Sequence, residues 1–325
     1  MQQSIAAHVV RWWLLLSLAL AGPVLAQVRE QPVSLSTPTG SIAGTLALPP
    51  GAGKVPVVLI IAGSGPTDRD GNNPMMRNDS LRMVAAALDD AGFASVRYDK
   101  RGVGASFAVA PDESALRFDA YVDDAAAWIA QLKADPRFGR VAVLGHSEGA
   151  LIGMPAARRA GADAYVSVAG IADGVGTILR RQLAGKLTPE LAAANERILA
   201  SLEGGAAAAA VPAPLAGLYR PSVQPYLISA MRYKPLEQMA ALRIPVLIVQ
   251  GTTDIQVGVD QAQMLKAARA DAVLAIVPGM NHVLKAVPAD PVRQLASYND
   301  PALPLAPQLA DAIAGFLRGL PAPQR

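Results

Sequence analysis

The sequence contains no cysteine and few histidines, and both absences limit its chemistry. Without cysteine, the 325 residues can form neither a disulfide nor a thiolate metal site. The histidines are His8, His146 and His282, and only two of them lie beyond the N-terminal segment. Two histidines are too few for a typical zinc site, although a site built mainly from carboxylates stays open. We therefore expect no metal and no cofactor.

Charged residues are also scarce. They make up 17% of the chain, the formal net charge is +3, and no run is rich in lysine or arginine. Because nucleic-acid-binding proteins need a concentrated basic surface, we expect no nucleic-acid partner. Hydrophobic residues make up 52% of the chain, which favours a globular protein with a large buried core. The length fits one large α/β domain with an insertion.

An apolar run near the N-terminus has the features of a targeting segment. Arg11 precedes the apolar residues 12–25, and residues 24–26 (VLA) have the small-residue pattern of a signal-peptidase site. We therefore expect a signal peptide over residues 1–26 and export to the periplasm or the cell exterior. An uncleaved anchor is the alternative. No later segment is apolar for long enough to span a bilayer, so we expect no membrane span after cleavage.

Short apolar segments alternate with amphipathic ones along most of the chain. Residues 33–48 have the pattern of an antiparallel hairpin, and residues 57–61 (VVLII) are apolar on both faces, as a central parallel strand is. Further strands are predicted at 94–98, 141–144, 164–168, 244–250 and 273–277, and helices at 79–91, 118–133, 148–160, 260–269 and 308–317. This alternation predicts a mostly parallel sheet with helices on both faces.

Residues 171–240 interrupt this alternation. They contain no convincing strand, but they have helical patterns at 177–187 and 189–202. About seventy residues far exceed the usual connection between two strands. We therefore predict an inserted helical cap over residues 171–240, and a core made of residues 27–170 and 241–325. An ordinary long crossover is the alternative.

Residues 145–149 (GHSEG) carry the strongest chemical signal. They match G-x-S-x-G and lie between a predicted strand and a predicted helix, which is the context in which this motif forms a nucleophile elbow. Such a turn would lift the Ser147 hydroxyl above the sheet and point the N-terminus of the following helix at the site. A plain turn between a strand and a helix is the alternative, which this context disfavours.

A serine nucleophile needs a base, and few candidates are present. His146 adjoins Ser147, but neighbours on such a turn point in different directions, which leaves His282 in the loop after the last core strand. Asp254 follows a predicted strand at the edge where catalytic groups of open α/β sheets lie, so we predict that it orients His282. Asp260 is the second candidate, although its position is more typical of a helix N-cap.

Acyl transfer also needs N–H donors for the developing oxyanion. We expect one from the backbone of Glu148 and one from Ser64, with Gly65 as the alternative to Ser64. The Glu148 side chain could bind a substrate amine, but an acid favoured by the helix dipole is the preferred interpretation. The remaining candidates for the substrate pocket are Gly65, Leu218, Tyr219, Tyr226 and Met231.

Together these motifs resemble the α/β-hydrolase superfamily, and within it the serine aminopeptidase and lysophospholipase-like esterases. The resemblance spans about residues 55–320 and is carried by residues 62–72 (AGSGPTDRDGN), 97–106 (RYDKRGVGAS), 145–149 (GHSEG), 251–254 (GTTD) and 281–282 (NH). It implies the α/β-hydrolase fold, a cap-covered acyl pocket and ester hydrolysis. Residues 62–63 are Ala-Gly where many relatives have His-Gly, a departure that bears on the second oxyanion donor.

The combined interpretation is a serine hydrolase that cleaves carboxylic esters with a small or medium acyl group through an acyl-enzyme. Its expected partner is a small-molecule ester. Two alternatives stay open. One is an aminopeptidase or amidase that uses the same Ser147, His282 and Asp254, and the other is a catalytically inactive binding protein of the same fold. The sequence does not determine the oligomeric state.

Overall fold

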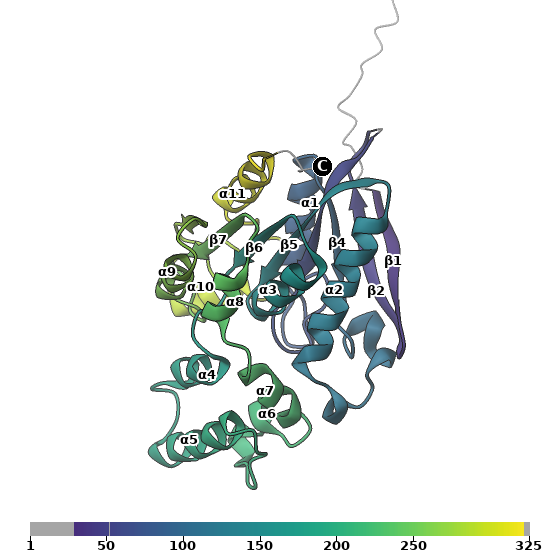
Figure 1. The fold of residues 1–325 in the computed structure, drawn as a ribbon. Coiled ribbons are helices and arrows are strands. Elements are labelled where there is room, and N and C mark those ends of the chain that lie inside the picture. The colour runs from purple at the N-terminus through teal and green to yellow at the C-terminus, as the bar shows by residue number, and fades with distance from the viewer. Residues whose placement is uncertain (1–28, 52, 322–325) are drawn as a thin grey trace, which may run out of the picture.

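A single sheet organises the structure, a computed structural model that describes residues 29–51 and 53–321. The predicted signal peptide lies outside these residues. The strands are β1 (Arg29–Thr37), β2 (Gly40–Leu48), β3 (Val55–Ile61), β4 (Ala94–Tyr98), β5 (Phe138–His146), β6 (Ala164–Val168), β7 (Val246–Gly251) and β8 (Val273–Val277). Their order is β1-β2-β4-β3-β5-β6-β7-β8 (Figure 1). β2 is antiparallel to β1 and β4, and the other neighbours are parallel.

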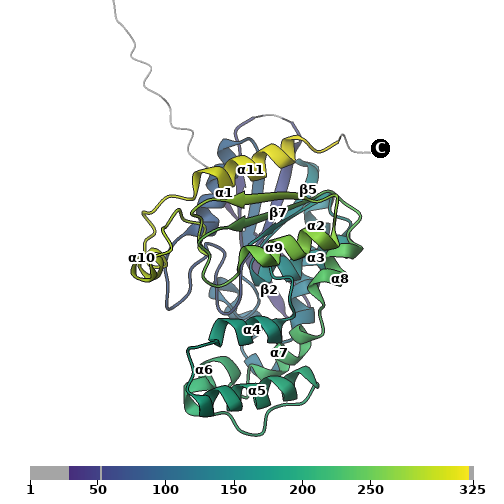
Figure 2. The same ribbon diagram turned by 90° about the vertical axis from the view of Figure 1, so that its left-hand side faces the viewer.

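Helices cover both faces of this sheet, as the apolar strands require. The helices α2 (Phe118–Ala134), α3 (Glu148–Ala160), α8 (Pro235–Ala241) and α9 (Val259–Ala268) cover one face, and α1 (Ser80–Asp90) and α11 (Pro307–Arg318) cover the other (Figures 1 and 2). Each face has its own hydrophobic cluster, and successive side chains of β3 alternate between them. Leu59 belongs to the cluster that includes residues of α2 and α3, and Ile60 belongs to the one that includes residues of α1 and α11. The central strands of the sheet are therefore buried on both sides.

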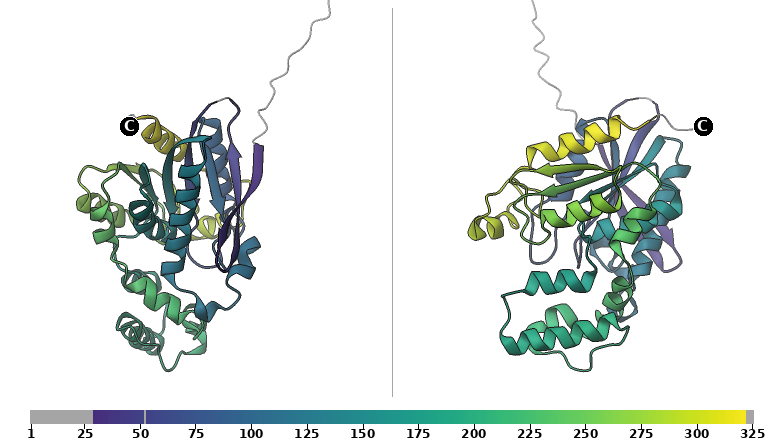
Figure 3. Two further views of the ribbon diagram at one scale, coloured as in Figure 1. Left: turned by 45° about the vertical axis from the view of Figure 1, so that its right-hand side comes forward. Right: turned by 60° about the vertical axis from the view of Figure 1, so that its left-hand side comes forward.

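The connection from β6 to β7 contains only helices among its regular elements, as the sequence predicted. The helices α4 (Val175–Leu183), α5 (Pro189–Glu203), α6 (Ala216–Tyr219) and α7 (Gln224–Met231) form a layer that projects from the α/β unit (Figure 3). This helical layer has its own hydrophobic cluster, which includes Leu199, Leu202 and Tyr219. In contrast, α8 packs against α3 and α9 on the sheet.

Several helix boundaries differ from the prediction, and each difference has a local cause. The helix expected to reach residue 187 ends at Leu183, and Gly185 follows in the left-handed region at φ 69°. α10 (Pro291–Ser297) was not predicted, although Asp290 accepts a hydrogen bond from the backbone N–H of Arg293 and caps it. None of the described helices is both long and apolar enough to cross a membrane.

Candidate active site

The turn between β5 and α3 holds Ser147 in an uncommon backbone conformation. Its φ is 54° and its ψ is −120°. The flanking glycines make this turn possible. A Cβ atom on Gly145 would lie 2.3 Å from the carbonyl oxygen of Gly149, and one on Gly149 would lie 2.2 Å from that of Ile61. Because neither glycine carries a side chain, α3 can approach the end of β3 closely.

Three distant segments bring Ser147, His282 and Asp254 into one hydrogen-bonded chain. His282 Nε2 lies 3.1 Å from Ser147 Oγ, and His282 Nδ1 lies 2.8 Å from Asp254 Oδ2. The Asp254 side chain is fully buried, and that of His282 is 7% exposed. All three residues follow the carboxyl ends of parallel strands, so the sheet itself assembles them.

Asp254 is held in one orientation by donors on both carboxylate oxygens. The backbone N–H groups of Gln256 and Val257 donate to Oδ1 at 2.8 and 2.9 Å, and Gln250 Nε2 donates to Oδ2 at 3.2 Å. Burial alone would raise the pKa of Asp254, but His282 and these N–H groups outweigh burial and lower it. The group is therefore a carboxylate at neutral pH, and it can accept a hydrogen bond from the Nδ1–H group of His282.

Asp260, the second candidate for the acid, lies elsewhere. It is in the first turn of α9, where its carboxylate forms an ion pair with Arg181 at 2.6 Å and accepts a hydrogen bond from Gln261 at 3.0 Å. The N-cap position itself is occupied by Gly258.

His146 forms no hydrogen bond with the Ser147 hydroxyl, but it does bind the backbone of His282. Its Nε2 donates to the carbonyl oxygen of His282 at 2.8 Å. Burial, with a smaller effect from the charge of His282, lowers the pKa of His146 to about 3, so its ring is neutral at physiological pH. Sequence reasoning set His146 aside as a base and missed this contact, which depends on how two loops meet.

The candidate oxyanion donors lie beside Ser147. Gly63 and Ser64 line the same cavity as Ser147 and His282. A Cβ atom on Gly63 would lie 3.3 Å from Ser147 Cβ, so this loop runs directly against the nucleophile. Within the described part of the chain, the backbone N–H groups of Ser64 and Glu148 donate to no other protein group. Both are thus free to bind a ligand oxygen.

Comparison with known proteins places this chain in a family. Residues 79–286 match the model of the family described as serine aminopeptidase, S33. The chain belongs to the S33 serine aminopeptidase family.

Proteins similar to this S33 chain in sequence or in fold include esterases and a peptidase. It is 29% identical to Esterase EstD of Thermotoga maritima over 255 residues, which are 74% of this chain and 57% of that protein. The chain thus spans little more than half of that relative. Est1E from Butyrivibrio proteoclasticus, solved with ferulic acid bound, has a TM-score of 0.60 at 18% identity, covering 89% of this chain and 98% of that one. An acylaminoacyl peptidase from Pyrococcus horikoshii has a TM-score of 0.56 at 13% identity, with 92% and 42% covered. The fold is therefore the α/β-hydrolase fold.

The cavity beside Ser147 in this S33 chain has a volume of about 190 Å³, and its walls differ from the predicted ones. Besides the residues already named, they include Thr67, Gly71, Asn73, Met76, Ser80, Gln256, Val283 and Tyr298. None of the five predicted pocket residues is among them. The actual walls are mostly small or polar side chains from the loops that follow β3, β7 and β8 and from the ends of α1 and α10, and no apolar pattern in the sequence marks them.

The predicted pocket residues of the insertion lie in other environments. Tyr219 is buried in the helical layer, where its hydroxyl donates to Asn195 at 2.7 Å, and Met231 belongs to the same cluster. Tyr226 packs against Tyr121 with ring centroids 5.5 Å apart, and Leu218 is partly exposed. Gly65, with a φ of 67°, lies in the same loop as Gly63 and Ser64 but does not line the cavity. Tyr219, Tyr226 and Met231 are therefore packed inside the protein, and none of the five residues lines the cavity beside Ser147.

The loop over residues 68–78 supplies part of the cavity wall and is ordered by its own side chains. Asp68 accepts hydrogen bonds from the backbone N–H groups of Asp70 and Asn72, both at 2.9 Å. Arg69 forms a paired contact with Asp99, at 3.0 and 2.7 Å. Among the described residues, no group of three or more His, Cys, Asp or Glu side chains is arranged to hold a metal ion.

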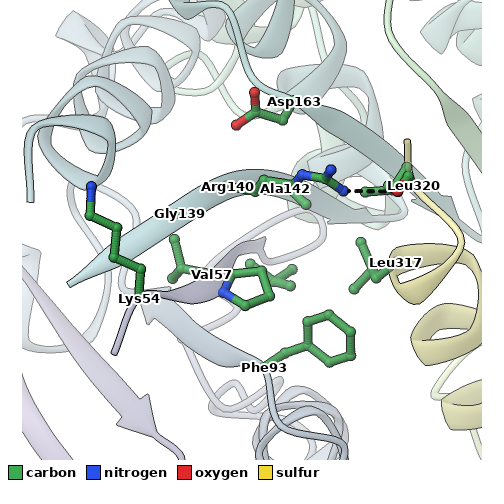
Figure 4. A pocket seen from close by; sticks show the side chains of 11 residues that line it. Lys54, Val57, Phe93, Gly139, Arg140, Ala142, Asp163, Leu317 and Leu320 are labelled. Atoms are coloured by element: carbon green, nitrogen blue, oxygen red, sulfur yellow. Dashed lines mark hydrogen bonds between the residues drawn. The ribbon is translucent and has the colours of Figure 1, made fainter. Parts of the chain in front are cut away.

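A larger cavity of about 280 Å³ lies at the opposite edge of the sheet (Figure 4). Its walls include Lys54, Arg140 and Asp163, at or just before the amino ends of β3, β5 and β6. Arg140 donates to the carbonyl oxygen of Leu320 across this cavity at 3.2 Å. Since Ser147, His282 and Asp254 all follow carboxyl ends, this cavity is separate from the candidate active site.

Proposed function

We propose that this protein is a serine hydrolase that cleaves carboxylic esters through an acyl-enzyme on Ser147. The observation that carries the proposal is the continuous hydrogen-bonded chain from Ser147 through His282 to Asp254. In the proposed mechanism, Ser147 Oγ attacks the ester carbonyl carbon while its proton passes to His282 Nε2. Asp254 holds His282 in the tautomer with the proton on Nδ1 and stabilises the imidazolium that forms.

The rest of the cycle uses the same groups. The oxyanion of the tetrahedral intermediate would accept hydrogen bonds from the backbone N–H groups of Ser64 and Glu148. As the intermediate collapses, His282 gives its proton to the leaving alcohol and the acyl group stays on Ser147. A water molecule then attacks the carbonyl carbon of the acyl-enzyme while His282 takes one of its protons. As the second tetrahedral intermediate collapses, His282 returns that proton to Ser147 Oγ and the carboxylic acid leaves.

The size of the cavity supports short acyl groups. Pockets that enclose drug-sized ligands usually measure about 300–1,000 Å³, whereas the cavity beside Ser147 measures about 190 Å³. Its walls also include polar side chains such as Asn73 and Gln256. We therefore propose acetyl to butyryl esters as the preferred acyl range.

The environment of Glu148 disfavours the aminopeptidase alternative, even though the family carries that name. An aminopeptidase needs a carboxylate to bind the substrate's terminal ammonium group. The Glu148 carboxylate lies 3.5 Å from the ammonium group of Lys100, whose side chain is buried. Since Glu148 already has a cationic partner, it is poorly suited to bind a second one.

Parallel assays test this proposal. We expect a fluorophosphonate probe to label the protein, and p-nitrophenyl acetate and butyrate to be hydrolysed with higher kcat/KM than p-nitrophenyl octanoate or alanine p-nitroanilide. Ser147→Ala should abolish labelling and lower kcat by at least about 10³-fold, while the exposed-site control Ser114→Ala should change neither. Faster anilide cleavage would favour a peptidase, and a folded but unlabelled protein would favour a binding role.

Two further proposals concern regions around this enzyme core. We propose that residues 171–240 act as a cap that borders the substrate. We expect Leu218→Asp to alter KM for longer acyl esters, and unchanged kinetic constants at every acyl length would argue against a cap.

From the sequence of residues 1–26 we also propose export with cleavage after Ala26. A mature protein found in the periplasm or medium should begin at Gln27, and a retained N-terminus would contradict cleavage.

A further inference from the structure

Lys100 is a buried lysine beside the candidate active site that the proposed mechanism does not use. It follows β4 in the segment 97–106 (RYDKRGVGAS), and its side chain is 1% exposed. Its ammonium group donates to the carbonyl oxygen of Gly63, lies 3.5 Å from Glu148 Oε2 and stands 5.1 Å from the ring centroid of Tyr121. Burying an ammonium group costs free energy unless such partners compensate it. The burial of Lys100 among these three groups therefore suggests that the contacts themselves have a role.

The two polar partners of Lys100 coincide with the two candidate oxyanion donors. The carbonyl group of Gly63 belongs to the same peptide unit as the N–H group of Ser64. In a trans peptide these two groups point in opposite directions, so a bond that fixes the carbonyl also fixes the direction of the N–H. The second partner, Glu148, carries the other candidate donor on its backbone. One ammonium group thus connects the loop after β3 with the first residue of α3.

We propose that Lys100 is a positioning residue for the oxyanion hole, which ties the Gly63–Ser64 peptide to Glu148 so that both N–H groups face the cavity beside Ser147. This inference rests on the proposed function. Lys100 does not line the cavity itself, so it acts through the two backbone groups rather than on the substrate. Their alignment before the reaction is what makes such donors effective, because no reorganisation is then needed as charge develops.

A neighbouring ion pair of the same segment provides a matched control for the loss of a buried cation. Arg101 forms a paired contact with Asp124, at 2.6 and 2.5 Å, and both side chains are largely buried. The side chain of Arg101 contacts neither Gly63 nor Glu148. Arg101→Met therefore leaves a carboxylate unpaired in the same way as Lys100→Met does, but it does not touch the oxyanion segments.

The test compares Lys100→Met and Arg101→Met with the wild-type protein in two assays. The first measures kcat per active site, with the concentration of active sites determined from the burst of p-nitrophenol. The second measures inhibition by a trifluoromethyl ketone. This inhibitor forms a tetrahedral adduct with an oxyanion. We expect Lys100→Met to lower kcat about 10- to 100-fold, with KM changed less than about twofold, and to weaken inhibition by the same factor as kcat. A purely structural lysine would lower the melting temperature and the active fraction, but not kcat per active site.

A second variant keeps the test decisive if Lys100→Met does not fold. Lys100→Met/Glu148→Met removes both charges, so no buried carboxylate is left unpaired, and the loss of kcat and of inhibitor affinity should persist. Wild-type kcat and inhibition in a folded variant would overturn the inference, as would an equal loss in Arg101→Met. A crystal structure of the variant adds a readout that needs no turnover. A Gly63–Ser64 peptide in its wild-type orientation would overturn the inference, whereas a wild-type protein that no fluorophosphonate labels would overturn the proposed function instead.

Discussion

The neutral, buried His146 makes a prediction about stability in acid. Its pKa is lowered from 6.5 to about 3, with burial as the largest cause. Below pH 6.5 the unfolded chain takes up a proton at this position and the folded protein does not. The contribution of His146 to stability is therefore complete above pH 6.5 and is lost as the pH falls toward 3.

The pKa difference sets the magnitude. Since one pKa unit corresponds to about 1.4 kcal/mol, the whole effect amounts to about 5 kcal/mol below pH 3. At pH 5 the unfolded state is already protonated and the folded state is not, so about 2 kcal/mol of unfolding free energy should be lost relative to pH 8. His146→Gln removes the titration, and its side-chain amide can still donate to the carbonyl oxygen of His282.

Urea unfolding of both proteins at pH 8 and pH 5 provides the assay. Other groups titrate in both proteins, so only the difference between the two pH effects reports on His146. We expect the wild-type protein to lose about 2 kcal/mol more than His146→Gln between the two pH values. The comparison at pH 8 measures the cost of the substitution separately. Equal losses in both proteins would refute the buried, uncharged state assigned to this ring.

Two further predictions concern the acid and the elbow. In an ester assay, Asp254→Asn should lower kcat about 10³- to 10⁴-fold because the amide favours the wrong His282 tautomer. The control Asp260→Asn should keep a kcat near that of the wild-type protein. Similar kcat values for the two variants would show that Asp254 does not orient His282. Gly149→Ala should destabilise the protein by several kcal/mol, since its Cβ would lie 2.2 Å from the carbonyl oxygen of Ile61. Gly217→Ala, with nothing within 4 Å of its Cβ, should change the unfolding free energy by less than about 1 kcal/mol, and equal melting temperatures for the two variants would contradict the steric argument.

The sheet and the elbow could be predicted because local patterns determine them. Residues 57–61 are apolar on both faces and form part of the central strand β3, and α3 spans Glu148–Ala160 as expected. The short helix α10 was missed because only its cap and first proline mark it, and its exposed positions include Val292 and Leu295. The residues of the insertion that were predicted for the pocket do not line the cavity beside Ser147. Apolar residues have the same composition whether they pack together or face a ligand, so the sequence could not distinguish the two roles.

The order of amino acids was enough to show which side chains were available for chemistry and on which elements they lie. With no cysteine and only His146 and His282 beyond the N-terminal segment, G-x-S-x-G at residues 145–149 left few choices for nucleophile and base. The tertiary structure alone decided which groups surround them. The contact of Lys100 with Gly63 joins positions 37 residues apart, and that of His146 with His282 joins positions 136 apart. Such contacts depend on how loops from different strands meet at one edge of the sheet, and no periodicity along the chain records that.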